Sequence, residues 1–255
     1  MAAYADLDGV RTWYDERGRG EPLVALHPGL VDARALAATV EVLAGHFHVY
    51  TPERRGHGHT PDVDGPASFD LMADDTVAFL ERVVGGPARL LGVSDGAMVA
   101  LLAAVQRPDL VRQLVCIAGP FNRDGWVPEA IDPANTPPDF FATSYGEVSP
   151  DGIEHYPAVV EKLARAHLEG PTLTAGDIAG VACRALVMMA DDEEVTLEHT
   201  VEFYRALPRG ELAIVPGTSH GLLVEKPDLC HRIVLDFLTN DPVQTLAPLR
   251  RRPPR

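Results

Sequence analysis

One short stretch of the chain combines residue types and a spacing that could do chemistry. Residues 88–105 read ARLLGVSDGAMVALLAAV, in which Ser94 stands between two glycines and between two apolar runs. Such a Gly-x-Ser-x-Gly turn between a strand and a helix is typical of a nucleophilic serine. Gly92 and Gly96 make so tight a turn feasible, because a Cβ at either place would collide with the neighbouring strand or helix. The helix would point its positive end at an oxygen that must carry charge.

A serine hydroxyl is a weak nucleophile until a base takes its proton, so the chain must supply a base from elsewhere. Ten histidines are available, and their positions distinguish them. His220 lies in a loop just after the last expected strand, near the carboxyl edge of the sheet, where catalytic groups gather in open α/β sheets. We therefore predict His220 as the base; the alternative is a histidine of a surface loop.

The base would need an acid to orient it. Four acidic residues at 191–194 (DDEE) directly follow another expected strand. One of them could accept a hydrogen bond from the second ring nitrogen of His220. The others would then form a solvated acidic turn, and the residues alone leave open which acid is used.

The oxygen of a tetrahedral intermediate requires two backbone N–H donors. The N–H of Asp95, next to the expected nucleophile, is one candidate. The other is expected in the turn after the apolar run at residues 23–26, where Pro28 has no N–H to donate. Gly29 is the better candidate in that turn and Leu30 the second; the alternative is an ordinary Pro-Gly turn.

The elements that must position these residues alternate along the chain. Short apolar or alternating runs predict strands at residues 9–17, 23–26, 46–50, 88–91, 111–118, 184–190 and 211–215. Amphipathic or apolar stretches predict helices at 33–43, 69–84, 156–169, 175–181, 196–207 and 228–238, besides the one after the serine turn. This order predicts an α/β fold with a mostly parallel, doubly wound sheet and helices on both faces.

The alternation stops after the strand at 111–118. Five prolines exclude a long helix from the first half of the next segment; they are Pro128, Pro133, Pro137, Pro138 and Pro150. We predict a small inserted cap at 121–182, a core made of 1–120 and 183–240, and a disordered basic tail at 241–255. The aromatic residues of the cap could line an apolar substrate wall or form the cap's own core; they are Phe121, Trp126, Phe140, Phe141, Tyr145 and Tyr156.

Composition narrows the classes of function. The chain has 255 residues and a net charge of −15, which disfavours nucleic acids and anionic membranes as partners. Its apolar runs are too short to span a bilayer, and its first residues lack the basic and apolar regions of a secretory signal. Three scattered cysteines without a CxxC pair fit a reducing compartment. We expect a cytoplasmic protein that acts on a small molecule.

The sequence predicts neither a cofactor nor a metal. His57 and His59 flank a glycine, but two ligands without a third nearby are a weak metal signal. The Gly-rich residues 17–20 lack the phosphate-loop pattern. A nucleophilic carboxylate at Asp95 is disfavoured, because the two glycines frame Ser94 instead.

Together these motifs resemble those of the α/β-hydrolase superfamily, in its bacterial esterase and lactonase-like branch. The resemblance covers roughly residues 8–119 and 183–238. Residues 27–29 (HPG) stand where the family has His-Gly-x, and residues 55–58 (RGHG) are similar to its Arg-Gly-x-Gly loop. The Ser-Asp-Gly sequence at Ser94 is similar to that of valacyclovir-hydrolase-like esterases.

The resemblance also implies an assignment for the acid. Residues 190–195 (ADDEEV) resemble the family's Gly-Asp-x-Asp-x-Val motif, and His220 matches the histidine of its Gly-x-x-His loop. The motif places the acid at Glu193, where the family usually has Asp. Because Glu is one methylene longer, Asp192 remains the alternative. A second departure is Pro28, which replaces the usual Gly of the oxyanion turn.

What the resemblance implies is a serine hydrolase that cleaves a carboxylic ester, lactone or thioester through an acyl-enzyme. In it, Ser94 would attack the carbonyl, His220 would move the proton, and Glu193 would orient His220. Two alternatives use the same fold. One is an acyltransferase or a lactone- or ring-forming biosynthetic enzyme, and the other is a ligand-binding protein without activity. The sequence determines neither the substrate nor the oligomeric state, and a homo-oligomer is one possibility.

Overall fold

A mixed sheet forms the centre of the protein, whose computed structural model describes residues 2–132 and 134–248. Its strands lie in the order β1-β2-β4-β3-β5-β6-β7-β8. Neighbours pair in parallel from β4 to β8 in this order, while β2 is antiparallel to both β1 and β4. The strands are β1 (Ala3–Leu7), β2 (Val10–Gly18), β3 (Pro22–Leu26), β4 (His48–Pro52), β5 (Ala88–Val93), β6 (Val111–Ile117), β7 (Arg184–Ala190) and β8 (Gly210–Val215).

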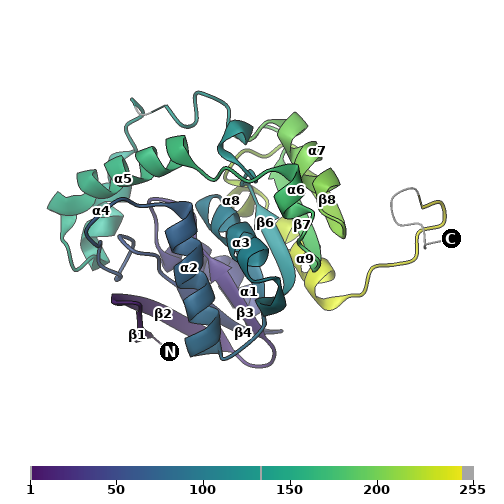
Figure 1. The fold of residues 1–255 in the computed structure, drawn as a ribbon, viewed down its shortest axis with the longest axis horizontal. Coiled ribbons are helices and arrows are strands. Elements are labelled where there is room, and N and C mark those ends of the chain that lie inside the picture. The colour runs from purple at the N-terminus through teal and green to yellow at the C-terminus, as the bar shows by residue number, and fades with distance from the viewer. Residues whose placement is uncertain (1, 133, 249–255) are drawn as a thin grey trace.

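Helices cover both faces of this sheet (Figure 1). On one face, α2 (Phe69–Phe79), α3 (Asp95–Gln106) and α7 (Leu197–Ala206) contribute to one buried apolar cluster. On the other, α1 (Ala37–Leu43) and α9 (Pro227–Thr239) contribute to a second cluster. The central strands β5, β6 and β7 are buried almost throughout, as parallel strands between two helical layers must be. The predicted α/β fold is therefore confirmed.

Between β6 and β7 the chain leaves the sheet. This segment holds α4 (Asp139–Val148), α5 (Tyr156–Glu169) and α6 (Ala175–Ile178). Figure 1 shows α5 above the upper end of α2, with α4 to the left, and buried side chains of α5 belong to the same apolar cluster as those of α3. This arrangement supports the proposed division into a core and a cap, and we keep the name cap for residues 121–182.

Short helical turns complete the described elements. They are η1 (Ala33–Leu36), the π-helical turn η2 (Leu80–Val84), η3 (Pro108–Leu110), η4 (Arg123–Gly125), η5 (Ile153–His155) and α8 (Leu222–Glu225). Two of them divide helices that were expected to be continuous. The helix expected at 33–43 begins with η1, and the one expected at 69–84 changes to η2 after Phe79. The start of α2 is as expected, because Ser68 Oγ accepts a hydrogen bond from the N–H of Leu71.

Other elements differ from the expectation. The strand expected at 46–50 lies two residues later, at His48–Pro52. β1, α4 and α8 had no counterpart among the predictions. α4 fits between Pro138 and Pro150, so the prolines exclude a long helix there but not one of ten residues.

The tail expected at 241–255 is described only in part. Residues 241–248 contain no helix or strand and are mostly exposed, and Figure 1 shows them leading away from the sheet. Residues 249–255, which carry the basic charge of this prediction, lie outside the described residues.

Candidate active site

Ser94 occupies the turn between β5 and α3 in a backbone conformation that non-glycine residues rarely adopt. Its φ is 54° and its ψ is −119°, and the residue is buried. Such strain persists only where the surrounding structure holds it, and it accompanies functional sites. Asp95 is the first residue of α3, so its N–H belongs to the group that has no partner within the helix.

The two glycines beside Ser94 are required by backbone packing. A Cβ on Gly92 would lie 2.0 Å from the carbonyl oxygen of Gly96. A Cβ on Gly96 would lie 2.2 Å from the carbonyl oxygen of Leu26, at the end of β3. Strand, turn and helix are therefore in direct backbone contact, and this contact fixes the position of Ser94 relative to β3.

We expect Gly92→Ala to lower the free energy of unfolding by about 1–3 kcal/mol, because its methyl group meets backbone rather than a movable side chain. Urea unfolding followed by circular dichroism measures the change. Gly176→Ala is the matched control, since its nearest neighbour, Thr174 Oγ1, would be at an ordinary 3.5 Å. Equal stability of the two variants would contradict this account of the turn.

The structure brings the three residues expected to form a triad into one hydrogen-bonded chain. Ser94 Oγ lies 3.0 Å from His220 Nε2 and can donate its proton there. His220 Nδ1 donates to Glu193 Oε1 at 2.6 Å. The Glu193 side chain is 1% exposed, and its carboxylate also accepts hydrogen bonds from the backbone N–H groups of Ala190 and Glu194. The carboxylate is therefore held in place by the end of β7.

The same loop shows why Glu193, and not its neighbours, meets the histidine. Asp192 is exposed, and its backbone N–H bonds to the carbonyl of Thr218. Asp191 accepts from the N–H of Thr218, so these two residues join the loop after β7 to the loop after β8. Glu194 Oε2 stays 3.7 Å from His220 Nδ1 on a half-exposed side chain. Of the alternatives, the structure places Glu193 against His220.

The surroundings of His220 favour its charged form. Burial would lower the pKa of the imidazole, but the hydrogen bond with Glu193 and the charge of that carboxylate raise it above the ordinary value. The charges of Glu194 and Asp95 act in the same direction. An imidazolium that forms during a reaction would therefore be stabilised where it forms.

The turn after β3 lies against the start of α3. A Cβ on Gly29 would lie 2.3 Å from Asp95 Oδ2, so the two residues expected to supply N–H donors are neighbours. The carbonyl of Pro28 accepts hydrogen bonds from His27 Nδ1 at 2.7 Å and from Arg54 Nη2 at 2.8 Å. Leu30 follows with a φ of 60°. The turn is thus held through its carbonyl groups.

Arg54 was not among the residues singled out from the sequence. Its side chain is buried, and it also donates to the carbonyl of His27. Burial lowers the pKa of the guanidinium to about 10, although the charge of the nearby Asp95 carboxylate partly opposes this shift. Burial and the charge of Arg54 together lower the pKa of His57 to about 4, and the pKa of His27 is lowered for the same two reasons. Both imidazoles are therefore neutral beside a buried cation.

A second unexpected residue comes from the cap. His167 on α5 reaches down to Asp95, and its Nε2 lies 2.7 Å from Asp95 Oδ1. Trp126, also in the cap, has its ring centroid 6.1 Å from that of His220 and 5.9 Å from that of His167. The two cap residues therefore lie beside the candidate base and beside the residue that follows Ser94.

The other aromatic residues of the cap were predicted either to line an apolar substrate wall or to form the cap's own core. Phe121 is buried and stacks on His199 with a centroid distance of 4.1 Å. Tyr145 and Tyr156 are buried against each other at 5.4 Å. Phe140 is 62% exposed. Most of the set therefore packs within the cap or its base, and Trp126 is the member that lies beside the candidate base.

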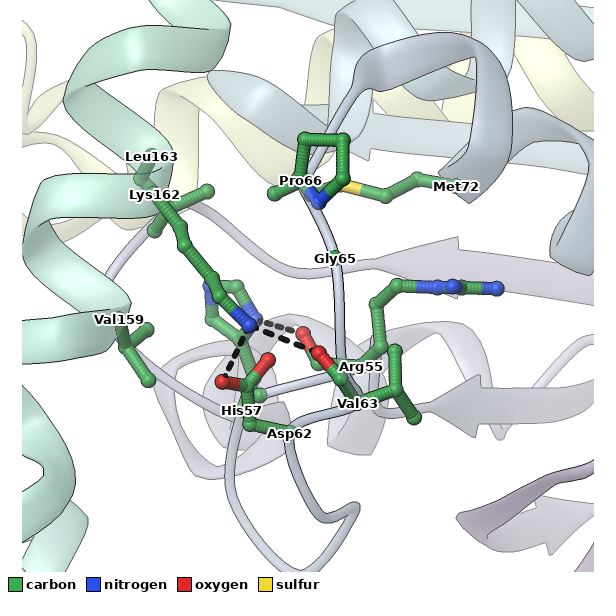
Figure 2. A pocket seen from close by; sticks show the side chains of 12 residues that line it. Arg55, His57, Asp62, Val63, Gly65, Pro66, Met72, Val159, Lys162 and Leu163 are labelled. Carbon is green, nitrogen blue, oxygen red and sulfur yellow. Dashed lines mark hydrogen bonds and ion pairs between the residues drawn. The ribbon is translucent and has the colours of Figure 1, made fainter.

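A narrow cavity adjoins this region between the loop after β4, α2 and α5. Figure 2 shows Arg55, His57 and Asp62 on the loop and Lys162 on α5 among its lining residues. Lys162 Nζ binds Asp62 Oδ2 at 2.6 Å, which closes the polar end. The lining does not include the candidate triad, so this cavity borders the site and does not contain it.

Several polar atoms near the site have no hydrogen-bond partner. Within residues 2–132 and 134–248, the buried side-chain atoms without one are Arg54 Nε, His57 Nε2, Asp95 Oδ2, Trp126 Nε1 and Tyr156 OH. A buried polar atom without a partner is costly, so such atoms gather where a ligand or water can bond them. His57 and Tyr156 also line one cavity together, next to Leu30 of the oxyanion turn.

Within residues 2–132 and 134–248, no three His, Cys, Asp or Glu side chains are grouped so that they could hold a metal ion. Among the described helices, none has the length and apolar character needed to cross a membrane.

Two known proteins with similar sequences over most of the chain are hydrolases. The chain is 24% identical over 250 residues to the (E)-2-((N-methylformamido)methylene)succinate hydrolase of Acinetobacter baylyi, which covers 90% of this chain and 94% of that protein. It is 24% identical to the human serine hydrolase BPHL over 252 residues, covering 93% and 86% of the two chains.

Solved structures show the same fold. The serine hydrolase CarC, involved in carbazole degradation, superimposes with a TM-score of 0.78 at 21% identity, over 94% of this chain and 98% of that one. The enol-lactonase of Burkholderia xenovorans gives 0.75 at 20% identity, over 93% and 100%. The sequence model of the alpha/beta hydrolase family matches residues 13–233. The protein is an enzyme of the α/β-hydrolase fold and belongs to the alpha/beta hydrolase family.

Proposed function

We propose that this enzyme is a serine hydrolase that cleaves a carboxylic ester, lactone or thioester through an acyl-enzyme intermediate. The observation that carries the proposal is the hydrogen-bonded chain from Ser94 through His220 to Glu193. This is the arrangement in which a hydroxyl is activated by a base that a carboxylate orients. The hydrolases and the enol-lactonase among its relatives and structural neighbours support the same reaction class.

Acylation begins when Ser94 Oγ attacks the substrate carbonyl carbon as His220 Nε2 takes its proton. Glu193 accepts the Nδ1–H bond throughout, so the lone pair of Nε2 stays directed at Ser94. The carbonyl oxygen becomes an oxyanion. When the tetrahedral intermediate collapses, His220 passes the proton to the leaving group and the acyl group stays on Ser94.

The oxyanion would be held by the backbone N–H groups of Asp95 and Gly29. Asp95 contributes a helix N-terminal N–H, and the turn that carries Gly29 lies directly against it. Donors held in place before the reaction stabilise the charge without having to reorganise, and one such donor contributes about 10²–10³ in kcat.

Deacylation reverses these roles. Water takes the position of the leaving group, His220 removes its proton, and the resulting hydroxide attacks the acyl carbonyl. Collapse of the second tetrahedral intermediate breaks the bond to Ser94 Oγ, which recovers its proton from His220. The chain's own residues supply every proton transfer in this cycle.

The second candidate is acyl transfer to an alcohol. Ser94 is only 8% exposed beneath the cap, so access of water to an acyl-enzyme is restricted. A stretch of 99 residues, 38% of the chain, is also 32% identical to a probable alcohol acetyltransferase of Wickerhamomyces anomalus. Two relatives that match over most of the chain are hydrolases, and we therefore place hydrolysis first.

The test is a panel of 4-nitrophenyl acetate and butyrate, a γ-lactone and an acyl thioester, each with and without added methanol. We expect an initial burst of one nitrophenolate per enzyme and then steady turnover to the free acid. Methyl ester as the main product would favour acyl transfer. A ligand that binds tightly and is never turned over, with no burst on any substrate, would favour the binding-protein alternative.

We further propose that the enzyme works in the cytoplasm on a small molecule. The three cysteines are free, and Cys116 and Cys230 are buried, as expected for thiols that are not used as cross-links.

A further inference from the structure

The contact between Asp95 and His167 joins the residue after the nucleophile to the cap. His167 Nε2 donates to Asp95 Oδ1 at 2.7 Å, and its Nδ1 donates to the carbonyl of Leu163 at 2.9 Å. A ring that donates from both nitrogens carries two protons and is therefore a cation. The structure thus contains a largely buried ion pair on Asp95, whose backbone N–H is one of the two expected oxyanion donors.

The neighbours of the ring fix its orientation. The centroid of Phe69, at the start of α2, lies 5.3 Å from that of His167 with planes at 66°, and Trp126 lies 5.9 Å away at 81°. The Asp95 carboxylate is 2% exposed and the His167 side chain 20%. In such surroundings an ion pair is little screened by water, so its geometry and its charge both matter.

The other oxygen of Asp95 faces the oxyanion turn. Oδ2 has no hydrogen-bond partner within the described residues, and it is the atom that a Cβ on Gly29 would meet at 2.3 Å. Arg54 and His57 also act on the charge of Asp95, and His220 is coupled to it as well. The single bonded partner of this carboxylate therefore comes from the cap.

We propose that His167 is a positioning residue, which acts through Asp95 to hold one oxyanion N–H in place and to neutralise a charge that would otherwise act on His220. The proposal rests on the proposed function, because it assigns a role in the same reaction. If this is so, a residue of the cap completes the site. Full activity then requires α5 to be packed so that His167 reaches Asp95 at the start of α3.

The charges on the two residues agree with this geometry. Burial would raise the pKa of Asp95, but the charge and hydrogen bond of His167, together with Arg54, lower it to about 2. Burial would lower the pKa of His167, but the charge and hydrogen bond of Asp95 raise it. The pair is therefore intact below the raised pKa of His167 and is lost as the pH rises through it.

His220 is affected by this pair through Asp95. Besides Glu193 and Glu194, the Asp95 carboxylate raises the pKa of His220. In the wild type the adjacent His167 cation offsets that carboxylate. Removing the cation therefore raises the pKa of His220. Removing the carboxylate lowers it at a pH low enough for His167 to keep its proton.

The test measures kcat and kcat/KM against pH for wild type, His167→Gln and Asp95→Asn. In His167→Gln we expect the acid limb of kcat/KM to move up by about half a pH unit, and in Asp95→Asn to move down by a similar amount. At the pH of maximal activity, the kcat of His167→Gln should be about tenfold lower than that of the wild type, with KM little changed. This loss is smaller than the loss expected when an oxyanion donor is removed, because the N–H is misplaced and not lost.

The matched control is His155→Gln. His155 is also in the cap and pairs with Asp62 at 2.8 Å, away from Ser94, while Lys162 still binds the same carboxylate. Its pH profile should match that of the wild type. Equal losses in His167→Gln and His155→Gln would reduce the role of His167 to general support of the cap.

A readout that needs no turnover separates this inference from the proposed function. NMR titration of the imidazole carbons should show His167 with a raised pKa in the wild type, and a fall in Asp95→Asn, which keeps the hydrogen bond but not the charge. If these pKa shifts appear but the wild type cleaves no ester, the proposed function is wrong, while the ion pair between Asp95 and His167 is still supported. Acid limbs that move in the same direction, or an unshifted His167, would overturn the inference.

Discussion

Replacement of Ser94 by alanine is expected to lower kcat by about 10⁴-fold or more. The reason is that the nucleophile, base and acid act as a unit, and without Oγ no acyl-enzyme can form. The backbone should be unaffected, because alanine retains the Cβ that the strained turn already accommodates at φ 54°. The measurement is steady-state hydrolysis of the best ester or thioester of the panel, with circular dichroism to confirm folding.

The matched control for this variant is Ser144→Ala. Ser144 lies on α4, where its Oγ accepts a hydrogen bond from Arg34 Nη2, far from any proton transfer proposed here. It should keep wild-type kcat. An alanine variant of Ser94 that retains most of its activity would exclude the serine mechanism, whatever the control shows.

The second large effect is expected for Glu193→Gln. A glutamine keeps the length of the side chain, but it cannot stabilise an imidazolium and can hold the wrong tautomer of His220. The corresponding change in the serine protease triad lowers kcat by about 10⁴-fold, and we expect about 10³–10⁴-fold here. Measuring kcat across pH separates this loss from a simple change in the pKa of His220.

Asp192→Asn is the control that distinguishes Glu193 from Asp192 as the acid that orients His220. Asp192 is exposed and contacts the His220 loop only through its backbone N–H, which asparagine retains. Its activity should stay within about twofold of wild type, since surface substitutions of this kind cause small changes. A larger loss in Asp192→Asn than in Glu193→Gln would move the acid to Asp192 and show that the hydrogen bond to Glu193 is not the working one.

The candidate triad could be found from the sequence because each of its residues follows a recognisable strand. Ser94 follows β5, Glu193 follows β7 and His220 follows β8, all at the carboxyl edge of the parallel part of the sheet. Once strand order is inferred, the edge brings these loops together without further information. The choice between Glu193 and Asp192 needed coordinates, because two adjacent side chains differ only in which way the turn directs them.

The contacts made by the cap could not be predicted in the same way. His167 is an unremarkable histidine in an amphipathic helix, and its meeting with Asp95 depends on how α5 docks on α3. Arg54 lies beside the Arg-Gly-x-Gly motif, and its buried side chain could be recognised only from its bonds to the turn after β3. Side-chain pairs formed by docking of separate segments leave no spacing pattern in the sequence.

The secondary-structure elements also differ in how well the sequence predicts them, and the short elements outside the centre of the sheet are predicted least well. β7 lies at the residues expected, because a run of seven buried residues gives a clear signal. β1 is an edge strand of five residues in which half-buried and exposed positions alternate before the buried Leu7, and it is too short to give a clear signal. α8 is a single turn that follows the His220 loop and depends on the packing of Leu222 in the core.

The most direct test of the central claim is the intact mass of the protein after treatment with a fluorophosphonate. Such a reagent reacts with serines that a base activates, so it reports on Ser94 and His220 without knowledge of the substrate. The account predicts one adduct on the wild type and none on Ser94→Ala. An adduct that persists on Ser94→Ala, or a folded wild type that forms none, would contradict the proposal that Ser94 is an activated nucleophile.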